Sequence, residues 1–161
     1  MNNFLPKEYE VPSGSDRYMK LQKGENKFRV LSEKAILGYE WWVELEDGKR
    51  SPKRIPMDEK IPVDEIAEPE SIRHFWAFVI YNYALKKVQI LEITQKTIQR
   101  ALRALLKDEE WGSPRGYDIV ITKEGDTKET TKYQVMPKPA KKLDEGITKL
   151  YEDMNINLQE L

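Results

Sequence analysis

Cysteine is absent from this 161-residue chain, and histidine occurs once, at His74. Without cysteine the chain cannot form disulfides, thiolate nucleophiles or cysteine-ligated zinc sites. A single histidine excludes a multi-histidine metal site and leaves a Ser-His-Asp triad possible only through His74. We expect His74 to be a core-edge or base-contacting residue. The sequence therefore predicts neither a bound metal nor a cofactor.

Long apolar runs are also missing, and none approaches the roughly 18 residues of a membrane-spanning helix. The first residues, "MNNFLPKEYEVPSG", lack the basic and then apolar pattern of a secretion signal. We therefore predict an intracellular protein without a membrane partner.

Motifs of the common enzyme classes are absent too. The chain has no GxxxxGK[ST] phosphate loop, no GxSxG nucleophile elbow and no recognisable carboxylate pair. We predict no catalytic residues, and a nuclease or other enzyme is the least favoured of the functions considered.

Charge is plentiful, because charged residues make up 34% of the chain and hydrophobic residues 39%. The net charge of −1 hides a segregation. Residues 73–107 carry seven positive charges against Glu92 alone, whereas residues 108–161 carry eight positive and twelve negative charges. A local positive field followed by an acidic region suggests an anionic partner.

Residues 26–47 alternate between apolar and polar side chains, as one long strand does. The apolar positions are even-numbered before Gly38 and odd-numbered after it. One inserted residue produces such a change of phase, so we expect a β-bulge at Gly38. Since neighbouring side chains in a strand point to opposite faces, this predicts Trp41 inside and Trp42 outside. Without a bulge, the two indoles would exchange roles.

The rest of the chain divides into recognisable segments. Residues 47–71 hold four prolines and many acids and predict a long loop. Residues 72–94 predict a hairpin that turns near residues 84–87. Residues 95–112 have the apolar spacing of an amphipathic helix, and residues 117–137 predict a second hairpin.

The predicted order is three strands, one helix and two strands, with a final helix or tail. This is the order of the OB-fold, a mainly β, five-stranded Greek-key barrel that binds oligonucleotides. Another small β-barrel or an α+β sheet remains an alternative. We divide the chain into a flexible arm (1–16), an OB-fold domain (17–139) and an acidic amphipathic C-terminal segment (140–161).

Binding of single strands without sequence preference needs basic side chains for phosphates and exposed rings that stack on bases. Both kinds occur where an OB-fold would need them, in the first loop, the central hairpin and the last loop. The candidate nucleic-acid-binding residues are Arg29, Trp41, Trp42, Lys49, Arg50, Lys53, Arg54, Arg73, Trp76, Tyr81, Tyr83, Lys86, Lys87, Lys132 and Tyr133.

Any one of these rings is more often a buried strand residue than a stacking platform, by about two to one. Their expected convergence on one face favours binding. The basic residues of the predicted helix, Lys96, Arg100, Arg103 and Lys107, are read as solvated surface charges.

Several stretches resemble the single-stranded DNA-binding proteins of tailed bacteriophages. The similar stretches cover most of residues 15–139, and their most specific patterns are "GENKFRVLS", "GYEWW", "ILEITQKTI", "WG" and "YDIVITKEG". The resemblance implies an OB-fold that coats single-stranded DNA during phage replication or recombination, without catalysis. It also implies a location in the cytoplasm of an infected bacterial host.

The resemblance further implies that the C-terminal segment meets phage replication proteins. Residues 143–161 are only mildly acidic, so a helix docked on its own barrel or on a neighbouring subunit is an equal alternative to a free tail. The alternative function is a protein-interaction or assembly module on a small β-barrel that does not bind nucleic acid.

Overall fold

The computed structural model describes residue 4 and residues 17–66, 69–156 and 158. Almost all of the predicted arm (1–16) lies outside the described residues. The described chain is mainly β, with seven antiparallel strands and two α-helices. In chain order the elements are β1 (Gly24–Val30), β2 (Ile36–Glu44), β3 (Arg50–Pro56), β4 (Arg73–Asn82), β5 (Lys87–Ile93), α1 (Lys96–Lys107), β6 (Tyr117–Glu124), β7 (Lys132–Ala140) and α2 (Glu145–Met154).

The sheet follows the order β3-β2-β4-β1-β6-β7, and β5 pairs with β4 outside this path. One edge of β4 is shared by two strands, because Phe28 of β1 lies opposite Asn82 and Ile36 of β2 opposite Ala77. Strands β1 and β2 therefore pair with successive parts of the same edge of β4, as one bent strand would. The prediction of five strands was wrong, since the described sheet has seven.

The bulge predicted at Gly38 was also wrong. Pairing runs without a shift through Gly38 to Pro56 on one side and to Phe75 on the other. The phase instead changes in the link at residues 31–35, between β1 and β2. Gly38 serves close packing, because a Cβ there would lie 2.5 Å from the Ile55 carbonyl oxygen and 2.7 Å from the Phe75 ring.

Strand β3 occupies part of the segment that was predicted to be a loop. It pairs with β2 from Gly38–Pro56 to Glu44–Arg50 and forms one end of the sheet. Its prolines at positions 52 and 56 are tolerated because an edge strand leaves some N–H groups without a partner strand. The two predicted hairpins are confirmed as β4–β5 and β6–β7, and the predicted helix as α1.

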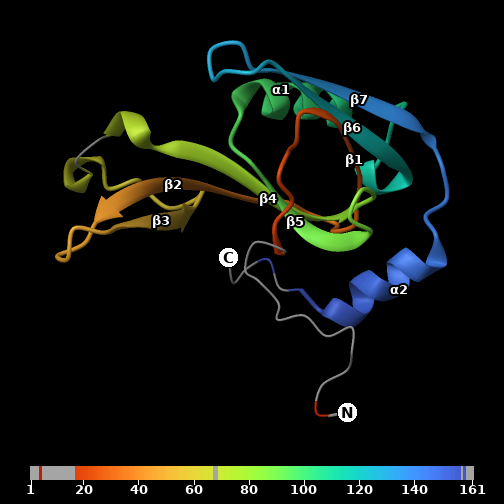
Figure 1. Cartoon of the computed structure of the whole chain (residues 1–161), viewed down its shortest axis with the longest axis horizontal. Helices are drawn as coiled ribbons and strands as arrows, with labels where there is room; N and C mark the ends of the chain where they lie inside the picture. The colour runs from red at the N-terminus through yellow and green to blue at the C-terminus, as the bar shows by residue number, and fades with distance from the viewer. Residues whose placement is uncertain (1–3, 5–16, 67–68, 157, 159–161) are drawn as a thin grey trace.

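The β2–β3 hairpin extends away from the curved remainder of the sheet (Figure 1). We call this hairpin the wing, and we call β1, β4–β7 and α1 the body. The body encloses a core to which every one of its strands and α1 contribute, including Phe28, Phe78, Leu91, Ile98 and Ile119. This arrangement is broadly consistent with a β-barrel-like domain.

Helix α2 lies on the other side of the body from α1 (Figure 1). Its Ile147 and Tyr151 pack against a cluster that contains Val79 and Val88 of the β4–β5 hairpin. The C-terminal segment is therefore docked on its own sheet as far as residue 158, with residues 157 and 159–161 outside the described part.

Candidate nucleic-acid interface

The predicted site residues do not converge on one face. One group lies on the wing and the adjoining start of β4, from Trp41 to Arg73. A second group lies near the β4–β5 turn, from Tyr81 to Lys87, at the far end of β4. Since a strand advances about 3.3 Å per residue, the two ends of β4 are roughly 30 Å apart. Lys132 and Tyr133, at the start of β7, form a third group.

Arg29 is used inside the body. Its side chain is 1% exposed, and its Nε donates to Asp118 Oδ1 at 2.7 Å. Its two terminal nitrogens donate to the carbonyl oxygens of Arg115 and Lys141, each at 3.0 Å. The guanidinium thus has no face left for a phosphate, and the prediction that Arg29 contacts nucleic acid is corrected.

Asp118 also organises Tyr83, whose hydroxyl donates to Asp118 Oδ1 at 2.7 Å. Burial by itself raises the pKa of Asp118, but the hydrogen bonds from Tyr83 and Arg29 outweigh it and hold that pKa below its usual value. Burial and the same hydrogen bond raise the pKa of the Tyr83 hydroxyl. Tyr83 is thus a structural residue, with one ring face under the ammonium group of Lys27 at 4.9 Å.

Tyr81 is half-buried and packs edge-on against Tyr83, with 5.1 Å between ring centroids. Its other neighbours include residues of the α2 cluster. Nearby Lys86 and Lys87 are exposed at the turn, but the rings beside them are engaged in packing. Likewise, Lys132 is exposed while the half-buried Tyr133 packs against the body core.

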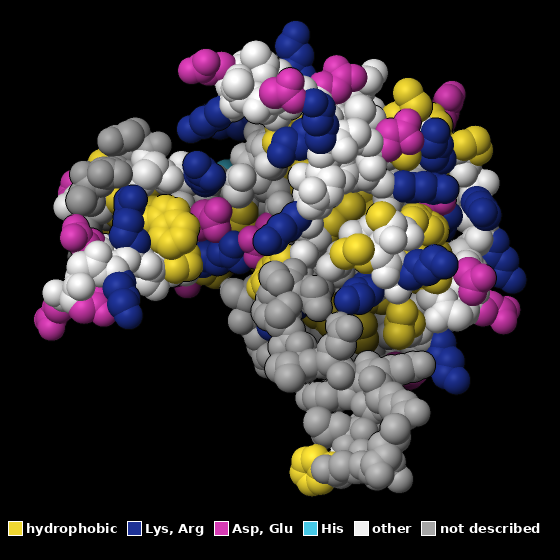
Figure 2. Space-filling view, in the orientation of Figure 1, with side chains coloured by type: hydrophobic (Ala, Val, Ile, Leu, Met, Phe, Trp, Pro, Cys, Tyr) yellow, Lys and Arg dark blue, Asp and Glu magenta, His cyan; other side chains and the backbone are white. Residues whose placement is uncertain are grey.

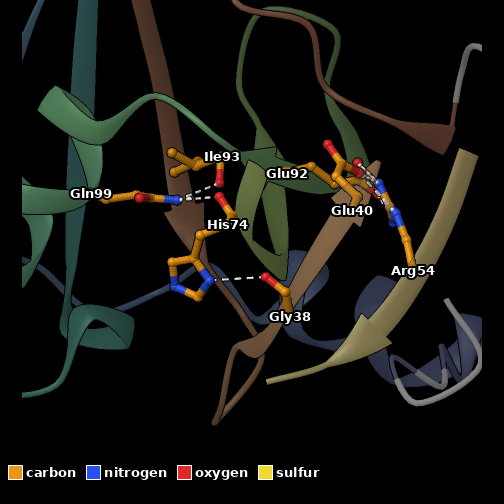
Figure 3. Close-up of polar contacts among 7 residues, drawn as sticks. All are labelled: Gly38, Glu40, Arg54, His74, Glu92, Ile93 and Gln99. Atoms are coloured by element: carbon orange, nitrogen blue, oxygen red, sulfur yellow. Dashed lines mark hydrogen bonds and ion pairs between the residues drawn. The ribbon is translucent and has the colours of Figure 1, made fainter. Parts of the chain in front are cut away.

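Arg54 ties the wing to the body (Figure 3). Its guanidinium donates to Glu40 of β2 at 2.8 Å and to Glu92 of β5 at 2.5 Å. It also lies over the Phe75 ring, 4.5 Å from the centroid. Hydrogen bonds with Glu92, followed by those with Glu40, outweigh burial and raise the pKa of Arg54. Arg54 therefore stabilises the contact between the wing and the body, and its charge is already neutralised by two carboxylates.

Trp76 is likewise engaged, because its indole N–H donates to His74 Nε2 at 3.2 Å. His74 Nδ1 then carries the hydrogen and donates to the Gly38 carbonyl oxygen at 2.9 Å (Figure 3). Gln99 of α1 donates to the carbonyl oxygens of His74 and Ile93, at 3.0 and 2.9 Å. His74 is thus a half-buried residue at the edge of the core, with both ring nitrogens satisfied.

The adjacent tryptophans of the wing point to opposite faces, and their assignment is confirmed. Trp41 is 3% exposed, whereas Trp42 is 52% exposed. The assignment was right for a different reason from the predicted one, since the phase change lies before β2 and not at Gly38.

Trp42 borders a slot of about 260 Å³, which we call the Trp42 slot. Pro52 lies opposite Trp42 across the β2–β3 pair, and Arg73 lies opposite Glu40 across the β2–β4 pair. The slot is lined by Glu40, Trp41, Trp42, Pro52, Arg54, Ser71 and Arg73. Its volume falls below the roughly 300–1,000 Å³ of drug-sized ligand sites, so it suits a single flat ring.

Arg73 is exposed and makes no ion pair with another described residue. It is therefore the cation of the slot that is available to an anion. On the space-filling surface the wing carries a hydrophobic side chain between Lys and Arg side chains (Figure 2). Lys49, Arg50 and Lys53 are also exposed on the wing.

Sequence reasoning missed Pro52 and Ser71, which help to form the slot. Both lie in the segment that was predicted to be a loop, where no periodic pattern marks a side chain's direction. Their position became visible only through the pairing of β3 with β2.

Within the described ranges, no three His, Asp or Glu side chains lie close enough to hold a metal ion. No helix in the same ranges has the length and apolar character needed to cross a membrane. Comparisons with protein-family models, curated proteins and solved structures found no match to this chain.

Proposed function

We propose that this chain is an OB-like protein that binds single-stranded DNA without sequence preference, in phage replication or recombination. The observation that carries the proposal is the half-exposed indole of Trp42 on the wing, which forms a ring-sized slot with Arg73 at the start of β4. Base stacking on an aromatic ring and a phosphate contact from a nearby cation are the two elements that such binding needs.

The topology supports the OB-like part of the proposal. If β1 and β2 count as one bent strand, then β4, β5, β6 and β7 follow in the OB order, with α1 between β5 and β6. The pairings β1–β4, β4–β5, β1–β6 and β6–β7 support this mapping, and the described sheet is open because β5 and β7 do not pair with each other. The wing then occupies the connection between the first and second strands, which is one of the loops that bind ligands in this fold.

Intrinsic fluorescence tests the proposal directly. A thymidine 30-mer in low salt should quench the tryptophan signal and shift the protein in a native gel. Trp42→Ala should weaken binding roughly 5- to 150-fold, which corresponds to the 1–3 kcal/mol of one stacked base. The matched control is Trp111→Ala, since Trp111 is also exposed but lies outside the slot. Absence of any binding by the wild-type protein would overturn the proposal.

Salt dependence tests the phosphate contact separately. Arg73→Gln should reduce the slope of log affinity against log salt by about one, because one phosphate contact releases about one counterion. The control Arg115→Gln removes an exposed arginine that pairs with Glu33 at 3.7 Å and does not line the slot. An unchanged slope for Arg73→Gln contradicts the assignment of Arg73.

A protein-interaction module is the second candidate, and the charge balance of the wing favours it. Residues 36–56 carry four acids and four bases, so the wing has no net charge to attract a polyanion. A protein interface centred on Trp42 predicts little effect when Lys49 and Arg50 are both replaced by Gln, whereas DNA coating predicts a large, salt-linked loss.

A further inference from the structure

An apolar cleft opens from the body core beside α1 and the link between β1 and β2. Its volume is about 530 Å³, which lies within the roughly 300–1,000 Å³ of small-molecule sites. Leu37 of β2 and Leu106 of α1 line the cleft and are each 41% exposed. Its deepest walls are core residues that are at most 7% exposed, namely Val30, Phe78, Leu102 and Ile119. The cleft therefore gives a small molecule access to the apolar core.

The polar side chains of the cleft come from two neighbouring loops. Ser32, Glu33 and Lys34 belong to the link between β1 and β2. Ser113 lies in the connection between α1 and β6. The ion pair between Glu33 and Arg115, at 3.7 Å, joins the two loops. The cleft is thus amphipathic, with its polar groups gathered on the side of these loops.

Ser32 offers a hydrogen-bond donor that the protein does not use. The residue is 6% exposed, and its Oγ accepts a hydrogen bond from the Val79 N–H at 3.1 Å. A hydroxyl also has one hydrogen to donate, and no described residue accepts it from Ser32. The Oγ of the exposed Ser113 likewise accepts from the Arg115 N–H at 3.3 Å. A buried donor without an acceptor is destabilising, so an acceptor on a bound molecule would stabilise Ser32.

Lys34 gives the cleft one available positive charge. It is exposed and forms no ion pair with any residue of the described ranges. Glu33 also lines the cleft, but Arg115 balances its charge. One ammonium group and two hydroxyl donors suit a monoanion that accepts several hydrogen bonds, as a carboxylate does. A phosphate monoester, with a charge of about −1.5 to −2, would need more positive charge than these groups supply.

We propose that the cleft binds a small amphipathic carboxylate, such as a medium-chain fatty acid. Its apolar chain lies against Phe78 and Ile119, and its carboxylate accepts from Ser32 and Lys34. Trp76 suits the apolar end, because its indole N–H already donates to His74 and its ring carbons remain for contact. The cleft shares no lining residue with the Trp42 slot, so the proposal stands independently of the proposed function.

Calorimetric titration of the purified full chain with alkanoates tests the proposal. Decanoate, kept below its micelle concentration, should bind with one molecule per chain. Affinity should rise about fourfold with each methylene added from hexanoate to decanoate, because each methylene becomes buried. Decyltrimethylammonium has the same chain with a positive head and should bind at least about tenfold more weakly. Absence of decanoate binding overturns the proposal, and so does equal binding of the two amphiphiles.

Substitutions in the cleft locate the bound molecule. Ala35 lines the cleft at an exposed position, so Ala35→Phe fills the space and should weaken decanoate binding at least about tenfold. The control Ala104→Phe places the same ring at an exposed position of α1 outside the cleft. Lys34→Gln should weaken binding about threefold to fivefold and reduce its salt dependence, with Lys96→Gln as control. Unchanged binding by Ala35→Phe would place decanoate elsewhere and overturn the proposal.

Vesicles distinguish a free carboxylate from a membrane surface as the source of the ligand. The chain should bind monomeric decanoate and should not sediment with vesicles of anionic phosphatidylglycerol. Sedimentation with the vesicles without binding of monomeric decanoate would mean that the cleft faces a lipid surface, and this result also overturns the proposal.

Discussion

The body and the wing place the same residue types in opposite situations. In the body, Arg29 is buried and bonded to Asp118, and rings such as Phe28 fill the core. On the wing Trp42 is half-exposed, and the adjoining Arg73 at the start of β4 is exposed without an ion pair to a described residue. A buried charge must be paired, because the cost of removing it from water is otherwise not offset. The body thus uses Arg29 for stability, whereas Trp42 and the adjoining Arg73 remain available for binding.

The largest expected effect is on the ion pair of the body. Asp118→Ala leaves Arg29 buried without its partner, which should lower the free energy of unfolding by about 3–5 kcal/mol. Urea denaturation measures the loss. The control is Asp126→Ala, because Asp126 pairs with Lys23 at the surface, where such pairs contribute about 0–1 kcal/mol. Equal losses of unfolding free energy for the two variants would contradict the view that the buried ion pair contributes more than the surface pair.

The adjacent tryptophans sharpen the comparison within the wing. Trp41→Ala removes a buried indole and should cost about 3–5 kcal/mol in unfolding free energy. Trp42→Ala removes a half-exposed indole and should cost far less, about 0.5 kcal/mol. Urea denaturation of both variants checks the prediction. A large loss for Trp42→Ala would mean that its indole is structural rather than available for stacking.

A smaller loss of unfolding free energy is expected when Arg54, which joins the wing to the body, is replaced. Arg54→Gln keeps a polar side chain but removes its charge and breaks its ion pairs with Glu40 and Glu92, which are partly exposed to water. We expect a loss on the order of 1 kcal/mol. Hydrogen exchange of β2 and β3 amides should then quicken roughly fivefold, with body amides unchanged. Lys53→Gln on the same strand is the control. Faster exchange throughout the body would contradict the view that Arg54 stabilises only the wing.

The smallest expected effect is the change of unfolding free energy with pH near neutrality, to which Asp118 and Tyr83 contribute. The pKa of Asp118 is held low in the folded chain, so its pairing stabilises the fold above the unfolded carboxyl pKa of about 4. This contribution is lost as pH falls through the folded-state pKa. The raised pKa of Tyr83 stabilises the fold below pH about 10, and that contribution is lost at higher pH. Urea midpoints should therefore be flat from about pH 5 to 9, and Asp118→Asn should reduce the decline in acid.

Much of the fold could be read from local patterns. The β4–β5 and β6–β7 hairpins and helix α1 appear where alternation and helical spacing predict them. Strand β3 could not be read in this way, because its prolines and charges resemble those of a loop. Its identity depends on β2, which supplies the partner strand.

The candidate site likewise has features that follow from the sequence and others that depend on the tertiary structure. The sequence by itself determined which residues are aromatic or basic, and the alternation over residues 39–45 determined that Trp41 and Trp42 face opposite ways. Only the tertiary structure decided which cations remain available. Arg29 meets Asp118 across 89 positions of the chain, and Arg54 meets Glu92 across 38. Such partners are set by how strands pair, so no local pattern separates these bonded arginines from the exposed Arg73.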